Sequence, residues 1–223
     1  MRGITFIDMD TGESRNTDST WGLIMSAKRI GMPEPRIVKV DMADRDGEID
    51  LSETLRGRVS YKNRPLSFSF INTDAQWTWQ LEYSEIVRFV HGKRLKIIDP
   101  DTSTEYYIGR CTVSEPTYIG AALMFFDINV DADPYRLHLH ETVVTAPMLE
   151  NLLVQLRNEH MPVVPVITTD GDVTIRFGTF STALTAGSVY RIPEITLEQG
   201  MNEIEIVSGT GTEITFTYRQ GAI

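Results

Sequence analysis

The sequence is poor in three features on which whole classes of protein depend: cysteine, basic charge and long apolar runs. Its 223 residues contain one cysteine, Cys111, so an intrachain disulfide and an all-cysteine metal site are excluded. Lysine and arginine number 21 against 31 acidic residues, and a net charge of −10 argues against a protein that neutralises nucleic-acid phosphates. No apolar stretch approaches the roughly 20 residues of a membrane-spanning helix, and the N-terminus lacks the apolar core of a signal peptide. We therefore expect an acidic, soluble protein made inside the cell.

One interruption divides the chain into two parts of equal net charge. At Asp131–Arg136, two acids and a proline interrupt a β-rich pattern, and proline cannot donate to a strand ladder. Residues 1–134 contain 16 basic and 21 acidic side chains, and residues 135–223 contain 5 and 10, so each part carries −5. The sequence therefore predicts two domains, 1–134 and 135–223, neither of them a basic recognition module.

Period-two alternation is the dominant pattern. Leu66, Phe68 and Phe70 alternate with Ser67 and Ser69, as in a strand with one buried face. A hairpin is predicted over 95–113 because turn-forming residues, with Asp99, Asp101 and Thr104 in a solvated turn, separate two β-branched runs. The apolar segment 118–130 is predicted to be a strand buried on both faces. Further strands are predicted at 36–40, 163–169, 173–177, 188–192, 203–207 and 213–218.

Two segments also have helical spacing. Ser84 offers an N-cap to a short helix over 84–91, and Gly92 is suited to its left-handed C-terminal residue. Leu149, Leu152, Leu153 and Leu156 also fit a helix, but 151–157 alternates equally well as a strand, so periodicity leaves that segment open.

Few residues suggest catalysis or metal binding. His138 and His140 would point to the same side of a strand and are weak candidates for a metal site, because zinc takes three or four protein ligands. Asp44–Ile49 has only part of a calcium-loop pattern, and a turn is the better interpretation. Nucleophile elbows and phosphate-binding glycine loops are missing from the sequence. We therefore expect no enzyme activity and no cofactor.

An ordered set of phrases runs along most of the chain. It begins with Arg36–Asp41 (RIVKVD) and Asp44–Glu53 (DRDGEIDLSE), continues with Tyr61–Phe70 (YKNRPLSFSF), and ends with Phe216–Gly221 (FTYRQG). Between these lie HGK at 91–93, IIDPD at 97–101, YYIGR at 106–110, DPY at 133–135 and GMNEI at 200–204. Over residues 20–223 the set resembles the distal tail protein family of siphophages and related prophages.

The resemblance implies a mainly antiparallel all-β subunit. Residues 1–134 would form a ring-forming β-sandwich or split barrel with one helix, and 135–223 a galectin-like β-sandwich. The resemblance also makes 151–157 a strand. In some family members the last strand returns to the N-terminal domain, and Thr215–Tyr218 could do so here.

The implied function is structural. Six copies would form a hub ring between the tail tube and the tail tip or baseplate, in a virion assembled in the bacterial cytoplasm, with a channel for DNA. The implied partners are other copies of the chain, the tail tube protein, a tail-tip or tail-associated protein and, as a further candidate, the tape-measure protein. DNA would only pass through, and the low basic content would keep it from binding.

Ring closure needs head-to-tail contacts between copies, which a long hairpin can supply. The charged segment 41–66 is the predicted interface element, with an ordinary surface loop as the alternative. Its candidate interface residues are Asp44, Arg45, Asp46, Leu51, Leu55 and Arg64.

Carbohydrate binding on the host surface is the alternative function. It would use the C-terminal domain, where Phe177 and Tyr190 are weak candidates for stacking on sugar rings. The domain holds no tryptophan, the residue best suited to that contact, so scaffolding is the favoured role.

Overall fold

The structure is a computed structural model that describes residues 3–43, 46–54, 57–72, 76–120 and 123–223, without the side chains of 76–79. The chain divides into two compact units, Met1–Arg136 and Leu137–Ile223. Both are mainly antiparallel β-structure, in agreement with the predicted fold class. In the described residues, every helix is too short or too polar to cross a membrane.

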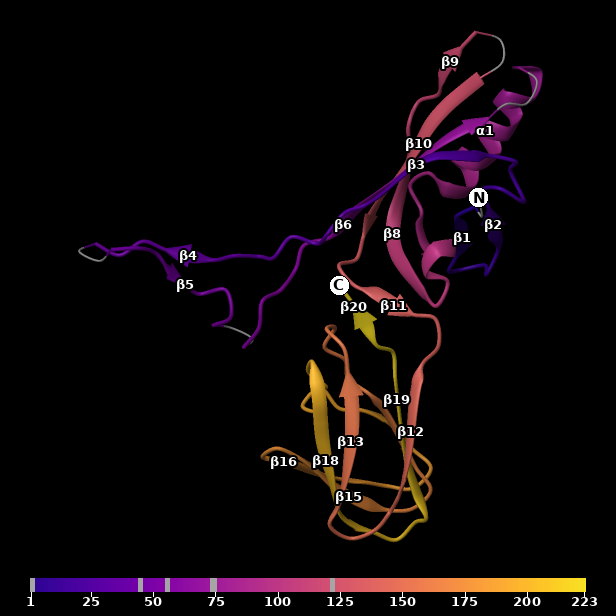
Figure 1. The fold of residues 1–223 in the computed structure, drawn as a ribbon. Coiled ribbons are helices and arrows are strands. Elements are labelled where there is room, and N and C mark those ends of the chain that lie inside the picture. The colour runs from indigo at the N-terminus through magenta and orange to yellow at the C-terminus, as the bar shows by residue number, and fades with distance from the viewer. Residues whose placement is uncertain (1–2, 44–45, 55–56, 73–75, 121–122) are drawn as a thin grey trace. The chain divides into compact units, whose positions relative to one another are not determined.

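The first unit is built on one large antiparallel sheet (Figure 1). Seven strands follow one another across it in the order β2-β1-β7-β8-β10-β6-β3, and β9 pairs with β10 beside them. Their bounds are β1 Thr5–Asp8, β2 Ser14–Asn16, β3 Ile24–Ile30, β6 Arg64–Asn72, β7 Arg94–Ile98, β8 Glu105–Val113, β9 Thr117–Ile119 and β10 Leu123–Ala132.

One face of this sheet is buried against helix α1, Gln76–Val90. Alternate residues of β6, including Phe68 and Phe70, are fully buried, as the period-two pattern predicts. The helix contributes Ile86 and Val90 to the same core. Trp21 packs edge-on against Phe89 with ring centroids 5.9 Å apart, which closes the core between the N-terminal segment and the helix.

The helix is longer than predicted at its N-terminal end. It begins at Gln76, so Ser84 lies within the helix instead of capping it, and its Oγ donates to the carbonyl of Gln80 at 2.6 Å. The predicted end is confirmed, because the helix stops at Val90 and Gly92 has a φ of 77°.

The segment predicted as one doubly buried strand is a hairpin. The chain turns after β9 at Gly120, whose φ is 62°, and returns as β10. Within β10, buried residues such as Met124 and Ile128 alternate with more exposed ones. In the sequence the segment is a continuous apolar run, because Tyr118 and Ile119, which are exposed, directly precede the apolar residues of β10.

The hairpin predicted over 95–113 is present as β7 and β8, joined by the short 3-10 helix η1, Pro100–Thr102. Its turn is not fully solvated as predicted. Asp99 is 1% exposed, accepts from the backbone nitrogen of Asp101, and binds Lys28 Nζ at 2.8 Å. Burial of that carboxylate is tolerated because it is paired and hydrogen-bonded.

The second unit consists of two four-stranded sheets. One has the order β12-β19-β14-β17 and the other β13-β18-β15-β16. The bounds are β12 Thr142–Pro147, β13 Leu152–Asn158, β14 Val166–Thr169, β15 Val173–Phe177, β16 Phe180–Leu184, β17 Val189–Arg191, β18 Gly200–Gly209 and β19 Glu213–Tyr218. The ambiguous segment 151–157 is therefore mostly the strand β13, whereas β12 and β16 were not predicted.

A single core lies between these two sheets. Ile167 and Phe216 from the first sheet and Ile175 and Ile206 from the second are all fully buried in one cluster. The strand that contains Thr215–Tyr218 is β19, which pairs with β12 and β14 inside this unit. The last strand of the chain is β20, Gly221–Ala222, which pairs with β11, Arg136–His138.

Candidate interface: an exposed arm and an open sheet face

A long arm joins β3 to β6 and consists of residues 31–63 (Figure 1). Strands β4, Lys39–Val40, and β5, Ile49–Asp50, pair with each other in a separate two-stranded sheet. At the base of the arm, Arg36 N donates to Ser60 O at 2.7 Å and Lys62 N donates to Glu34 O at 2.8 Å. These bonds hold the outgoing and returning segments together. The strand predicted over 36–40 is thus a two-residue strand within this arm.

The arm exposes apolar side chains that a soluble monomer ordinarily covers. Among the described residues of the arm, six large ones are at least 38% exposed: Met32, Ile37, Val38, Val40, Met42 and Leu51. Their succession along one segment marks an interaction surface better than isolated exposed residues would.

The predicted interface residues divide into three groups. Asp46 and Leu51 are exposed on the arm. Asp44, Arg45 and Leu55 lie outside the described residues. Arg64 was expected on the exposed element but is 2% exposed, so it is not a surface residue of this unit.

Arg64 is buried because it is the first residue of β6 on the side that faces the core. Its guanidinium lies over the Tyr107 ring at 5.5 Å, and within the described structure its Nε and Nη2 have no hydrogen-bond partner. Burial lowers the pKa of the Arg64 guanidinium below its ordinary value. Arg64 is therefore buried at an electrostatic cost at the point where the arm rejoins the sheet.

The face of the large sheet that points away from the core is open and has small side chains at its centre. In register across four strands lie Arg29 on β3, Ser67 on β6, Asn129 on β10 and Thr112 on β8. All are exposed or half-buried, and Thr112 Oγ1 donates to the Asn129 carbonyl at 3.3 Å.

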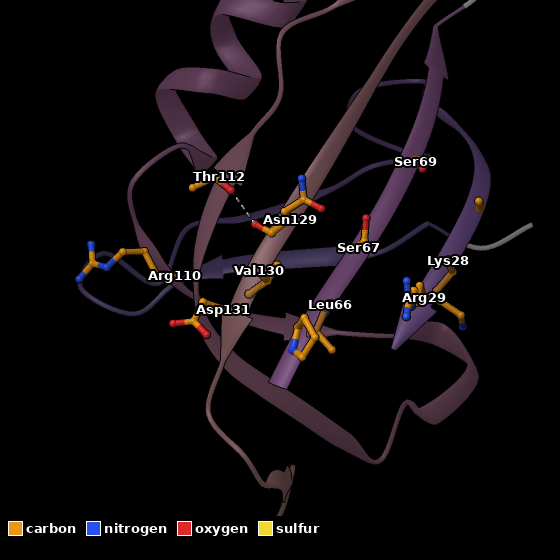
Figure 2. A pocket seen from close by; sticks show the side chains of 12 residues that line it. Lys28, Arg29, Leu66, Ser67, Ser69, Arg110, Thr112, Asn129, Val130 and Asp131 are labelled. Atoms are coloured by element: carbon orange, nitrogen blue, oxygen red, sulfur yellow. Dashed lines mark hydrogen bonds between the residues drawn. The ribbon is translucent and has the colours of Figure 1, made fainter. Parts of the chain in front are cut away.

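These small side chains leave a groove of about 810 Å³ between longer residues at its edges (Figure 2). Arg110 lies at one edge, and Lys28 and Arg29 lie at the other. Leu66 and Val130 also border the groove, although their side chains are buried in the core on the other face of the sheet. The sequence signal was present in Ser67 and Ser69, but the partners across the sheet could not be assigned without the register.

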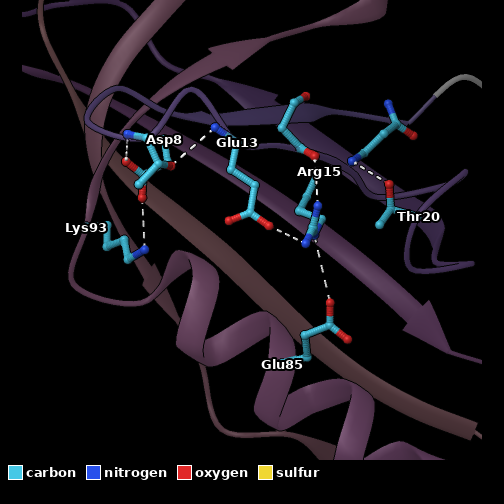
Figure 3. Close-up of polar contacts among 9 residues, drawn as sticks. Asp8, Glu13, Arg15, Thr20, Glu85 and Lys93 are labelled. Atoms are coloured by element: carbon cyan, nitrogen blue, oxygen red, sulfur yellow. Dashed lines mark hydrogen bonds and ion pairs between the residues drawn. The ribbon is translucent and has the colours of Figure 1, made fainter.

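A polar cluster beside the helix, in contrast, is internally paired (Figure 3). Asp8 binds Lys93 Nζ at 2.9 Å and accepts from two backbone nitrogens, and these bonds lower the pKa of its carboxyl. Arg15 pairs with Glu13 and lies 3.9 Å from a carboxylate oxygen of Glu85. These charges tie β1, β2 and α1 together, so the cluster is explained as structural.

The two histidines considered as metal ligands have different surroundings. His138 Nε2 lies 3.2 Å from Glu159 Oε2, whereas His140 is exposed beyond the end of β11. In the described part of the chain, no three His, Cys, Asp or Glu side chains are placed to hold one ion. Cys111 is fully buried, which raises the pKa of its thiol to about 12 and leaves it unreactive at neutral pH.

The two residues considered for sugar stacking face inward. Phe177 and Tyr190 both pack against the core of the second unit. The Tyr190 hydroxyl accepts from Thr185 N at 2.8 Å, which lowers the pKa of the phenol. Both side chains remain partly exposed.

No protein-family model and no curated protein sequence matches the chain. Among solved structures, the chain is similar to SPP1 Dit (gp 19.1), whose crystal structure is described as a paradigm of the hub adsorption apparatus in phages that infect Gram-positive bacteria. The TM-score is 0.67 at 13% identity, and the similarity covers 98% of this chain and 99% of that one. The chain therefore has the fold of the Dit distal tail hub protein over nearly its full length.

Proposed function

We propose that this chain is a distal tail protein, a structural subunit of the hub at the end of a siphophage or prophage tail. The observation that carries the proposal is the fold, because the similarity to SPP1 Dit extends over both units and not over one common β-sandwich alone. Fold similarity by itself does not define function. The exposed apolar arm adds an independent indication that the chain works as part of an assembly.

In this role six copies form a ring that joins the tail tube to the tail tip or baseplate. The arm of one copy meets a different surface on the next copy. Such head-to-tail contacts form a closed ring when the rotation that relates neighbouring copies completes a full circle. The partners are further copies, the tail tube protein and a tail-tip protein. DNA passes through the ring, and the net charge of −10 keeps its phosphates from being held. The role needs no catalytic residue and no cofactor.

Native mass spectrometry of the purified chain tests this proposal. We expect a species of six times the 25.2 kDa subunit, either alone or after addition of the tail tube and tail-tip proteins encoded beside it. Electron microscopy of that species should show closed rings. A chain that remains monomeric alone and with those partners would contradict the proposed function.

A further inference from the structure

We propose that the open groove on the sheet of the first unit is the receiving site for the arm of a neighbouring copy. This inference rests on the proposed function and deepens it, since it identifies which surface the arm meets. The groove is the one lined by Arg29, Ser67, Arg110, Thr112 and Asn129, and the arm segment is 37–53.

Charge complementarity is the first support. The groove lining contains three basic residues, Lys28, Arg29 and Arg110, and one acidic residue, Asp131. Residues 39–53 of the arm contain six acidic and two basic side chains. A chain with a net charge of −10 can approach another copy most readily where an acidic segment meets a basic border.

Some of the charged residues that line the groove already have partners within one copy, and others make no ion pair with the described residues. Asp131 already accepts from Asn63 Nδ2 at 2.8 Å, and Lys28 is bound to Asp99 and Asp101. Arg29 has no ion-pair partner among the described residues. Arg110 donates to the Gly92 carbonyl and makes no ion pair with the described carboxylates. The two arginines at opposite edges are therefore the cations available to an incoming acidic segment.

Shape is the second support. The middle of the groove is formed by Ser67, Asn129 and Thr112, whose side chains are too short to fill it. The arm is a narrow two-stranded ribbon that exposes Val38, Val40 and Met42. Placing these side chains in the groove removes them from water, which favours association.

The occupant is the arm of another copy because a chain's own arm is directed elsewhere. Gly31 N donates to Pro65 O at 2.8 Å at the ends of β3 and β6, and the arm continues away from those strands (Figure 1). The base contacts between Arg36 and Ser60 keep its two segments on that course. Groove and arm are therefore separate surfaces of one chain, which makes their contact head-to-tail.

Cysteine trapping on the full chain tests the contact directly. Val40→Cys is placed in one copy and Ser67→Cys in a second copy of different tag, the two are mixed, and the mixture is oxidised. Cys111 stays in place, because its buried thiol, with a pKa of about 12, does not compete. We expect a disulfide-linked heterodimer on non-reducing gels. The matched control pairs Val40→Cys with Ala183→Cys, at an exposed position of β16, and should give none. Equal trapping with both partners, or none with Ser67→Cys, would overturn the inference.

Charge exchange tests the same contact without a covalent bond. Arg29→Glu with Arg110→Glu in the groove should weaken association at least about 10-fold, and so should Asp41→Lys with Asp46→Lys in the arm. Mixing the reversed groove with the reversed arm should recover most of the loss. Arg191→Glu, at an exposed position of the second unit, should change association little. All variants are first checked for unchanged circular dichroism.

The outcomes separate this inference from the proposed function. If rings form, but the two cysteines form no disulfide and charge reversal does not weaken association, the groove is not the receiving site and the hub function stands. If the two cysteines trap but the chain never forms rings with its tail partners, the contact is real and the hub function is wrong.

Discussion

At the scale of single residues, Arg64 is the most unusual position in the chain. A guanidinium that is 2% exposed usually lies against a carboxylate, whereas this one lies over the Tyr107 ring and leaves two nitrogens without hydrogen bonds in the described structure. Desolvation of such a group is costly, and the ring returns only part of that cost. Arg64 is also the first residue of β6, directly after the arm.

This balance predicts that Arg64→Met keeps the packing and removes the charge. We expect the variant to be as stable as the wild type or more stable, by up to about 2 kcal/mol, because hydrophobic replacement of buried charge is often neutral or favourable. Urea unfolding of the two proteins measures the difference. Arg64→Ala is the matched comparison and should be less stable than Arg64→Met, because it also opens a cavity. A marked loss of stability in Arg64→Met would show that the charge itself is needed.

Residue-scale prediction from sequence succeeded where burial follows alternation and failed where it depends on distant strands. Phe68 and Phe70 were assigned to the core from their neighbours alone. Arg64 was predicted at the surface because it is charged. It lies on the inward-facing side of β6, because it alternates in step with Leu66, Phe68 and Phe70. The inward packing of Tyr190 depends on the opposite sheet, which no local pattern describes.

At the scale of elements, Asp170 links two connections of the second unit. It follows β14 and accepts from Thr212 N at 2.9 Å and from Glu213 N at 3.0 Å, at the start of β19. The Thr212 hydroxyl donates to the same carboxylate. These bonds, that of the Thr212 side chain first, lower the pKa of the Asp170 carboxyl below 3.8.

The lowered pKa predicts a pH-dependent contribution to stability. Since the folded-state pKa of Asp170 lies below the unfolded value, its stabilisation is complete above about pH 4 and is lost as the pH falls through the folded-state value. We expect Asp170→Asn to have a lower Tm at pH 7, with a difference from wild type that shrinks below pH 3.8. Thermal unfolding at pH 7 and pH 2.5 checks this, and Asp172→Asn serves as the neighbouring control. A constant difference at both pH values would contradict the assignment.

Element boundaries show what local patterns cannot determine. The end of helix α1 was predictable because the glycine that ends it, Gly92, is recognisable from the local sequence. Its start was not predictable, because Ser84 is a residue type that favours the N-cap position but lies within the helix. The β9–β10 hairpin was missed since Tyr118 and Ile119 are apolar and exposed, and sequence alone cannot distinguish them from core residues. Likewise, the open groove exists only once β3, β6, β10 and β8 are aligned.

At the scale of the whole molecule, each unit has its own hydrophobic core. One cluster contains only residues of the first unit, such as Ile128, and the other only residues of the second, such as Ile206. Among the described residues, neither core contains side chains of the other unit. Each unit is therefore expected to unfold as a separate cooperative block.

Paired conservative substitutions test this independence. Ile128→Val and Ile206→Val each remove one buried methylene group and should each cost about 1 kcal/mol. In differential scanning calorimetry, we expect each variant to lower the midpoint of a different transition and to leave the other unchanged. If both variants lower one common transition, the two cores unfold together.

The mainly antiparallel β-fold was predictable from alternation and turn residues, and the ordered phrases of the sequence pointed to the distal tail fold that the structure has. The arm was only partly predictable. Its charges predicted an exposed segment over 41–66, but the arm already begins at Gly31. The earlier start was missed because Met32, Ile37 and Val38 are apolar, as buried residues usually are, and are nevertheless exposed.

The way the arm is attached has a mechanical consequence. Both ends of the arm continue into neighbouring antiparallel strands, β3 and β6, at the same edge of the sheet. A pull on the arm therefore acts on both strands in the same direction, along their axes. The load passes to the ladder between β6 and β10, where nine residues of each strand are in register. Because ladder hydrogen bonds lie perpendicular to the strands, such a pull shears them in parallel instead of opening them one by one. A neighbour held by this arm would be held against force.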